Sequence, residues 1–454
     1  MSDTWDLLIK GGTCVMRGPN GHWQEVEIDV AILNRQIVAL GHLDEKKSQK
    51  VMPAKGLHVL PGLIDTQVHF REPGLEHKET LSSGSAGAVK GGITGVFEMP
   101  NTNPSTTSAI AIHDKLTRAN GHMWCHHAFY VGATAENAEQ LGGLEKLPGV
   151  CGVKIFMGSS TGTLLMADEV HLKRVLSNGR RRVAVHCEDE ERLKERRHLV
   201  DENPGQVALH PVWRDEETAL LATQKITRLS QETERPVHVL HVTTKQEMQY
   251  LKQLKPSLPH LSVECTPQHL TLAAPECYET LGTYAQMNPP IRDKYHQEAI
   301  WQALNDGTVD ILGSDHAPHT KEEKQKPYPL SPSGMPGVQT TLPLMLDHIH
   351  HGRLTLFRLL ELMVENPVRL FGIKDRGAIA VGKCADLTIV DLKAQREITN
   401  QWMETRSGWT PFAGMKVHGW PIATIIDGQI VMRDDQILGK PLGQPYEFTE
   451  TERS

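Results

Sequence analysis

Residues 59–74 read VLPGLIDTQVHFREPG, and this stretch opens the series of segments that decides the fold. The run 59–70 is mostly apolar but contains Gln67 and His69 close to its end. These two residues are two positions apart, so on a β-strand their side chains point to the same face. The pattern predicts a buried strand whose end presents two polar groups to one site.

Seven further runs follow, each short and apolar and separated from the next by a longer amphipathic stretch. They span 93–100, 126–132, 152–158, 182–187, 237–242, 261–266 and 309–314. Repeated strand-helix units of this kind are typical of a parallel sheet covered by helices. Eight units predict an α/β fold, a (β/α)8 TIM barrel over residues 59–374. The alternative is a doubly wound open sheet, but no glycine-rich dinucleotide turn follows the first run.

The two flanks, 1–58 and 375–454, show a different pattern. They contain short strand-like runs separated by turns, such as 6–12, 385–390 and 424–428. We predict a small β-sandwich domain formed by both termini. The last segment, 439–454, has several Pro, Gly and Glu residues, and we expect it to lie loosely on the surface or to be disordered.

Composition narrows the class of protein. A net charge of -7 and a pI near 6.4, without a cluster of Lys and Arg, argue against nucleic acid as a partner. Seven cysteines are scattered, odd in number and free of any CxxC pair, which favours a reducing compartment. No apolar run approaches the roughly 18 residues that span a bilayer. We therefore expect a cytoplasmic enzyme with a small-molecule substrate, no membrane contact and no nucleic acid.

The ends of the predicted strands carry polar groups that suit a metal site or an anion site. In barrels of this type, catalytic groups lie at the carboxyl ends of the strands. The residues in these positions are Gln67, His69, Arg71, Asn101, Lys154, His186, His241, Asp315 and His319. The sequence therefore predicts that groups far apart along the chain converge on one pocket.

Several of these residues have a specific chemistry. Lys154 lies in an apolar run, where a bare ammonium would be costly to desolvate, so we expect it to be modified or paired with an acid such as Asp315. His238 and His241 are three apart, so on a strand only one points inward, and we select His241. Asp315 is the expected proton carrier, although a helix-capping role is the plainer alternative.

A second group of these residues has the chemistry to bind an anion. The guanidinium of Arg71 can grip a carboxylate through two hydrogen bonds, with Asn101 and His319 as further donors. An arginine on the surface beside an acidic turn is the alternative reading of Arg71.

Seven motifs in order resemble the dihydroorotases of the amidohydrolase superfamily, in the longer type related to hydantoinases and allantoinases. They are HFREPG (69–74), EMPNT (98–102), VKIFM (153–157), HCED (186–189), HVLHV (238–242), MNPPIR (287–292) and GSDHAPH (313–319). The resemblance covers nearly the whole chain. It also implies a β-domain built from both ends.

The resemblance implies a site with two metal ions bridged by a carboxylated lysine. Carried over by position, the ligands would be His69, Lys154, His186, His241 and Asp315, while Asn288 and the loop 331–337 would contact the substrate. Gln67 stands where a histidine is expected, and it offers only a neutral carbonyl oxygen. We therefore expect one firmly held Zn2+ and a second ion of lower occupancy.

The implied reaction is the reversible closure of N-carbamoyl-L-aspartate to L-dihydroorotate in pyrimidine biosynthesis. Both compounds carry carboxylate charge, which Arg71, Asn101 and His319 would bind. This anion site favours a dihydroorotase over a hydantoinase or allantoinase, whose rings lack a carboxylate in that place. A catalytically silent scaffold that docks onto a transcarbamoylase is the alternative from another class, but such homologues generally lose several ligands. We also expect a homo-oligomer.

Overall fold

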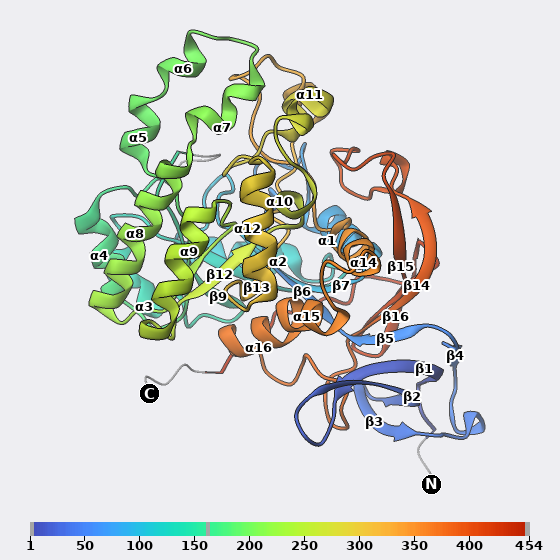
Figure 1. Ribbon diagram of the computed structural model, residues 1–454. Coiled ribbons are helices and arrows are strands. Elements are labelled where there is room, and N and C mark those ends of the chain that lie inside the picture. The colour runs from blue at the N-terminus through green and yellow to red at the C-terminus, as the bar shows by residue number, and fades with distance from the viewer. Residues whose placement is uncertain (1–3, 160–163, 450–454) are drawn as a thin grey trace.

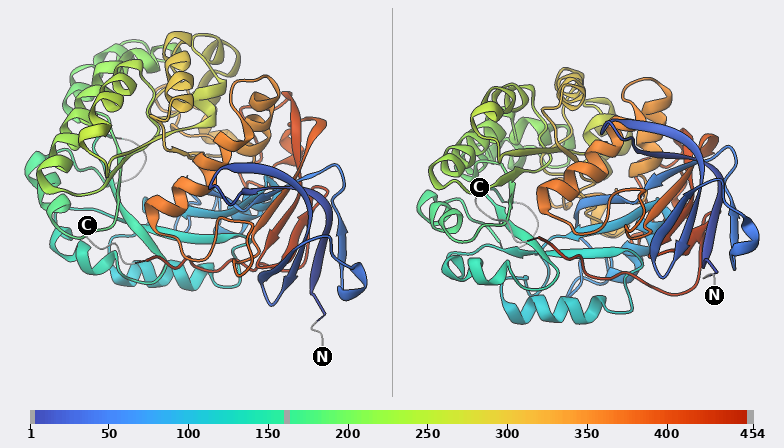
Figure 2. Two further views of the ribbon diagram at one scale, coloured as in Figure 1. Left: turned by 60° about the horizontal axis from the view of Figure 1, so that its bottom comes forward. Right: turned by 90° about the horizontal axis from the view of Figure 1, so that it is seen from below.

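A computed structural model describes residues 4–159 and 164–449, and its centre is a ring of eight parallel strands (Figures 1 and 2). Neighbours in the ring follow chain order, so each strand pairs with the next one along the sequence. The strands are β6 (Leu63–Val68), β7 (Ile93–Glu98), β8 (His126–Gly132), β9 (Val150–Phe156), β10 (Val183–His186), β11 (Val237–Val239), β12 (Ser262–Cys265) and β13 (Ile311–Leu312). The predicted barrel is confirmed, and each of the eight runs contributes one strand.

The ring closes between its first strand and the segment that follows its last. Strand β13 is only two residues long, and the closing contacts come from the residues after it. Val68 and His316 form a parallel bridge, and the His69 N–H donates to the His316 carbonyl at 2.7 Å. The Ser314 N–H donates to Asp65 Oδ1 at 3.0 Å. These contacts place the residue between them, Asp315, beside the end of β6.

Helices lie outside the ring and connect its strands (Figure 1). The main helices are α1 (Leu81–Lys90), α2 (Ala109–Ala119), α4 (Glu169–Ser177), α8 (Glu216–Thr233), α9 (Lys245–Leu254), α12 (Lys294–Asn305) and α14 (Thr341–His350), with the short α3 (Leu141–Leu144), α10 (Pro267–Thr271), α15 (Leu356–Leu360) and α16 (Asn366–Phe371). Side-chain caps fix where several of them begin. Thr80, Asp215 and Asp293 each accept a hydrogen bond from the backbone of the first turn that follows.

A second sheet is formed by the two termini and flanks the barrel (Figure 2). It contains nine strands: β1 (Leu7–Arg17), β2 (Trp23–Leu33), β3 (Gln36–Gly41), β4 (Val51–Pro53), β5 (His58–Pro61), β14 (Leu387–Glu397), β15 (Lys416–Ile426), β16 (Gln429–Arg433) and β17 (Gln436–Ile437). Strand β5 joins the two halves, because it pairs parallel with β1 and antiparallel with β14. The predicted β-domain from both ends is confirmed, and its strands form one mixed sheet.

The run 59–70, predicted as a single strand, is divided between the two sheets. Residues 58–61 pair in the terminal sheet and residues 63–68 in the barrel. Gly62 lies between them, and a Cβ there would come within 2.4 Å of Thr94 Oγ1. Only glycine fits this tight passage without displacing its neighbours.

The expectation of a loose C-terminal segment is wrong for residues 443–448. The N–H of Tyr446 donates to the His127 carbonyl at 2.8 Å, and the His127 N–H donates to the Gln444 carbonyl. Tyr446 and Phe448 are buried against Phe97 of β7 at the amino ends of the barrel strands. The two aromatic side chains anchor a segment whose composition alone suggests disorder.

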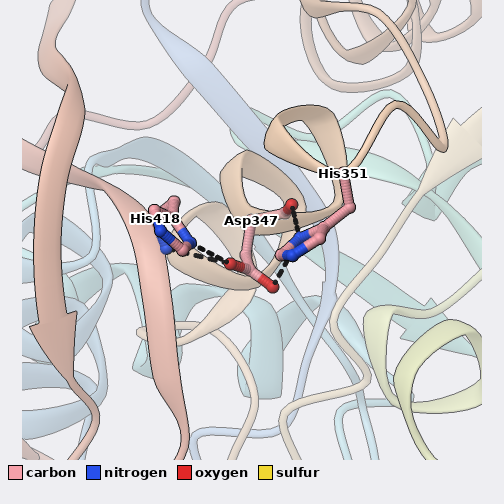
Figure 3. Close-up of side chains that lie close together, drawn as sticks. All are labelled: Asp347, His351 and His418. Carbon is pink, nitrogen blue, oxygen red and sulfur yellow. Dashed lines mark hydrogen bonds and ion pairs between the residues drawn. The ribbon is translucent and has the colours of Figure 1, made fainter.

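Helix α14 joins the barrel to strand β15 of the terminal sheet (Figure 3). A Cβ at Gly419, next to His418, would lie 2.5 Å from the Cβ of Leu346, and the φ of Gly419 is +87°. The glycine therefore permits a close approach of helix to strand. Among the described residues, no helix combines the length and apolar character needed to cross a membrane.

Candidate active site

Six of the nine polar groups predicted at the strand ends line one small cavity at the carboxyl ends of the barrel strands. Its lining includes Gln67, His69, Lys154, Phe156, His186, His241, Asn288, Asp315, Ala317, Ser333 and Gly334. The cavity has about 20 Å³ of free volume, which is enough for a water molecule or an ion. The predicted convergence of Lys154, His186, His241 and Asp315 is therefore present in the structure.

One side of the cavity is built by β6 and by the segment after β13. Asp315 Oδ1 accepts a hydrogen bond from Gln67 Nε2 at 3.0 Å and lies 3.1 Å from His69 Nε2. The other ring nitrogen of His69 is 2.7 Å from Asn101 Oδ1. Gln67 and His69 share a face, as their spacing predicts, and both contact the same carboxylate oxygen.

The opposite side is built by β9, β10 and the residues after β11. His186 Nδ1 lies 3.1 Å from His241 Nε2. Strand β11 ends at Val239, and His241 follows it with a φ of 37°, so the alternation of a strand does not apply to it. His241, the residue selected from the sequence, does line the cavity, whereas His238 is also buried but contacts Glu264 instead.

Lys154 lies in the cavity without a hydrogen-bonding partner for its Nζ among the described residues. The side chain is 1 % exposed, and burial lowers the pKa of its amine from 10.5 to about 7. The expected pairing with an acid is not formed, since Nζ makes no ion pair in the part of the chain described here. A buried amine in this state is costly unless another group completes its surroundings.

A buried carboxylate beside the cavity, that of Glu188, holds His186 in place. Glu188 Oε2 lies 2.8 Å from His186 Nε2 and accepts a hydrogen bond from Arg214 Nη2 at 2.7 Å. Burial by itself would raise the pKa of Glu188, but Arg214 and His186 hold it well below its usual range. The carboxylate therefore stays ionised and directs the Nδ1 atom of His186 toward the cavity.

Three residues of this region have backbone angles that side chains rarely adopt. Arg71, His241 and Asp315 have φ values of 64°, 37° and 43°. Conformations of this kind cost free energy and persist where the surrounding structure enforces them, often at functional sites. Here each of the three residues follows a barrel strand; His241 and Asp315 line the cavity, and Arg71 lines the cleft beside it.

The predicted anion-binding residues line a wider cleft beside the cavity. Arg71, Asn101 and His319 share this cleft, of about 790 Å³, with Lys78. Arg71 Nη2 lies 3.3 Å from His319 Nε2, and Lys78 Nζ lies 3.1 Å from His319 Nδ1. Asn288 lies apart from them, in the inner cavity, where its Oδ1 is 3.0 Å from His210 Nε2. Sequence reasoning missed Lys78, because it follows no strand and belongs to no predicted ligand pattern.

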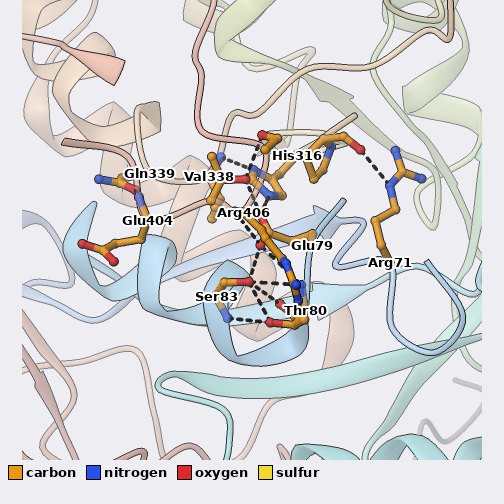
Figure 4. Close-up of polar contacts among 12 residues, drawn as sticks. Arg71, Glu79, Thr80, Ser83, His316, Val338, Gln339, Glu404 and Arg406 are labelled. Carbon is orange, nitrogen blue, oxygen red and sulfur yellow. Dashed lines mark hydrogen bonds and ion pairs between the residues drawn. The ribbon is translucent and has the colours of Figure 1, made fainter. Parts of the chain in front are cut away.

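A connection of the terminal domain reaches the same region (Figure 4). The segment between β14 and β15 provides the Arg406 N–H, which donates to Glu79 Oε1 at 3.1 Å, and Glu79 Oε2 lies 3.2 Å from His316 Nε2. Trp409 Nε1 donates to the carbonyl of His319 at 2.7 Å. The terminal domain therefore holds the segment that carries Asp315 and His319, which sequence patterns gave no reason to expect.

The residues present suit metal ions. Besides Lys154 Nζ, the buried atoms Gln67 Oε1 and His241 Nδ1 have no hydrogen-bonding partner among the described residues. Burial lowers the pKa of His69, His186 and His241, which favours the neutral imidazole. Neutral imidazoles, a carboxylate and an amide oxygen around a small cavity form a donor set that divalent cations accept.

Comparison with known proteins agrees with this site. A sequence profile of the amidohydrolase family matches residues 58–431. The chain is 33% identical to the dihydroorotase of Pyrococcus abyssi over 92% of this chain and 94% of that protein, and 34% identical to the dihydroorotase of Methanosarcina acetivorans over 91% and 90%. Among solved structures it is similar to the L-hydantoinase (dihydropyrimidinase) from Arthrobacter aurescens, with a TM-score of 0.90, 26% identity and coverage of 97% of this chain and 99% of that one.

Proposed function

Because the chain belongs to the amidohydrolase family, and because a cleft that contains the guanidinium of Arg71 adjoins its metal-type cavity, we propose that it is a dihydroorotase. The reaction is the reversible closure of N-carbamoyl-L-aspartate to L-dihydroorotate with loss of water. The observation that carries this choice is the placement of Arg71, Asn101 and His319 in the cleft next to Asp315. A substrate that binds there needs a carboxylate on one side of the reacting amide.

The metal ligands in this proposal are His69, Lys154, His186, His241 and Asp315, with Gln67 as a weaker partner. The amidohydrolase family is metal-dependent, and Lys154 Nζ, which has no hydrogen-bonding partner among the described residues, is the atom to which carbon dioxide would add. The new N–C bond would form as the neutral amine releases a proton to solvent, and the resulting carbamate would offer oxygen atoms that could hold metal ions. The chemistry that such ions supply when bound is Lewis-acid activation of water and of an amide carbonyl.

Asp315 carries out the proton transfers in this proposal. In the hydrolytic direction its carboxylate takes a proton from the attacking water and delivers it to the ring nitrogen that departs. In the biosynthetic direction it takes the proton from the carbamoyl nitrogen and returns it to the departing hydroxyl. Gln67 Nε2 and His69 Nε2 both lie close to Oδ1 and fix the orientation of the carboxylate.

In this proposal, residues of the cleft orient the substrate. Arg71 is buried, and its Nε donates to the Pro318 carbonyl at 3.2 Å, which holds the guanidinium at the edge of the site (Figure 4). A planar guanidinium fixed in this way offers its remaining N–H groups to both oxygens of a carboxylate. Lys78 lines the same cleft, where its Nζ is already paired with Glu323 Oε1 at 3.0 Å.

The nearest alternative is a hydantoinase, which the similarity to solved hydantoinases favours. Steady-state assays with dihydroorotate, hydantoin and allantoin, run together with metal analysis of the same preparation, separate the two. We expect turnover of dihydroorotate and bound zinc. Hydrolysis of hydantoin or allantoin without dihydroorotate would overturn the substrate assignment. No turnover together with no bound metal would support the silent scaffold.

The proposal extends to three further properties. Zinc is the proposed metal, with one ion held firmly and a second held more weakly because Gln67 supplies a neutral oxygen. The cytoplasm is the proposed compartment. The proposed assembly is a homo-oligomer, with a transcarbamoylase as the candidate protein partner.

A further inference from the structure

A second group of metal-ligand side chains lies away from the barrel mouth, where α14 meets β15 (Figure 3). Asp347 and His351 come from the end of the helix, and His418 comes from the strand. One ligand atom of each residue lies within 4.8 Å of the other two. None of these residues lines the candidate active site.

Two of the distances match those between neighbouring ligands of a bound metal ion. His418 Nδ1 lies 3.1 Å from Asp347 Oδ1, and His351 Nδ1 lies 3.4 Å from Asp347 Oδ2. In a tetrahedral zinc site with bonds of about 2.0–2.2 Å, neighbouring ligand atoms are roughly 3.3–3.6 Å apart. Small movements of the side chains are therefore sufficient to bind an ion.

The group is held in place by the packing around it. Oδ1 of Asp347 accepts a hydrogen bond from the His418 N–H at 2.9 Å, so helix and strand are already joined at the carboxylate. Gly419 allows this approach because it has no side chain to meet Leu346. His350 stacks on His418 with ring centroids 3.8 Å apart, which brings a third imidazole beside the group.

Solvent can reach the group from one side. The side chain of Asp347 is 10% exposed, that of His418 28% and that of His351 58%. The Asp347 carboxylate is mostly buried and the two imidazoles are more exposed, so the arrangement is open on one side. Water can supply the remaining metal ligand there. Because His351 is so exposed, the hydrophobic core does not require it.

We propose that Asp347, His351 and His418 bind a divalent transition-metal ion of the zinc class at the joint between the barrel and the terminal sheet. Without metal, His418 Nδ1 faces the Asp347 carboxylate, and His351 Nδ1 lies between that carboxylate and the Asp347 backbone carbonyl, which is 2.8 Å away. With the imidazole proton moved to Nε2, the same Nδ1 atoms coordinate the ion, and the carboxylate supplies the third ligand. The ion cross-links α14 to β15, so it stabilises the folded protein without taking part in the active-site chemistry.

The test compares untagged wild-type protein with His351→Ala and His418→Ala. His113→Ala is the matched control, since His113 is an exposed histidine on α2. Each purified protein, with its active-site metal retained, is titrated with Zn2+ in the presence of a fluorescent zinc indicator. The second active-site position takes up zinc in every protein, so the comparison is with the test variants: we expect wild type and the control to bind about one equivalent more than His351→Ala or His418→Ala, which should bind that equivalent roughly tenfold or more weakly.

Two additional measurements complete the test. Zinc should raise the melting temperature of wild type and of His113→Ala but not that of His351→Ala, and turnover without added zinc should be the same in all of them. Equal zinc binding by wild type and both test variants would overturn the proposal. The proposal would also be overturned if wild type bound no zinc beyond its active-site metal. Should His418→Ala fold poorly, His351→Ala decides the question alone, because its side chain lies mostly in solvent.

Discussion

Glu188→Gln tests whether the buried ion pair between Glu188 and Arg214, next to His186, supports both the fold and the metal site. Glu188 and Arg214 are 0 % and 2 % exposed, and two guanidinium nitrogens of Arg214 contact the carboxylate at 2.7–3.2 Å. Breaking such a pair leaves one uncompensated charge and costs about 3–5 kcal/mol. His186 also loses the ionised partner of its Nε2, which should weaken metal binding by roughly 10–100-fold.

The assay is denaturant unfolding of the metal-free proteins, followed by a separate metal titration. Measuring stability without metal prevents weaker metal binding from contributing to the loss. Glu191→Gln is the matched control, because Glu191 lies three residues further on and is exposed. An unfolding free energy of Glu188→Gln within about 1 kcal/mol of wild type, with unchanged metal affinity, would refute the reasoning.

Four other predictions concern the cleft, the metal site and the acid range. Gln67→His should tighten the second metal ion, because an imidazole replaces an amide oxygen; unchanged metal content and activity would count against this. Arg71→Lys should lower kcat/KM for dihydroorotate by about tenfold to a hundredfold, the equivalent of about 1.5–3 kcal/mol from a charged hydrogen bond, while hydantoin turnover falls less. An equal loss for both substrates would contradict the carboxylate role. Trp409→Phe removes the hydrogen bond to the His319 carbonyl; we expect a loss of about 1–3 kcal/mol in unfolding free energy and a raised KM for dihydroorotate, with kcat less affected. An unchanged KM would show that the terminal domain does not position the cleft. Burial alone would raise the pKa of Asp215, but hydrogen bonds to its carboxylate lower it from 3.8 to about 2. The ionised Asp215 carboxylate therefore adds to the free energy of unfolding above pH about 4, and this contribution is lost as the pH falls toward about 2. The urea midpoints of wild type and Asp215→Asn should converge over that range.

The barrel and the composition of its site can be read from the sequence. Each barrel strand is a short apolar run, and the polar residues that matter stand at the ends of those runs. Parallel strands bring their carboxyl ends to one edge, so His69, Lys154, His186 and Asp315 could be expected to meet before any coordinates were known. The spacing of Gln67 and His69 likewise predicts a shared face, because side chains alternate along a strand.

Other features depend on contacts between segments that are distant in sequence. Nothing local to residues 59–70 marks the change of sheet at Gly62, which is required by Thr94 on the next strand. Tyr446 is anchored by pairing with His127, although its neighbours in sequence suggest disorder. Lys78 and Trp409 reach the cleft only because separate loops fold against it.

The physical reason for this division is the range of the interactions. Strand alternation, apolar runs and helix caps act over a few neighbouring residues, so the amino-acid sequence alone determined the barrel and which chemical groups its strand ends would present. A passage between sheets, a buried tail and a cluster such as Asp347, His351 and His418 each require surfaces that exist only once the chain has folded. Tertiary structure alone decided those features.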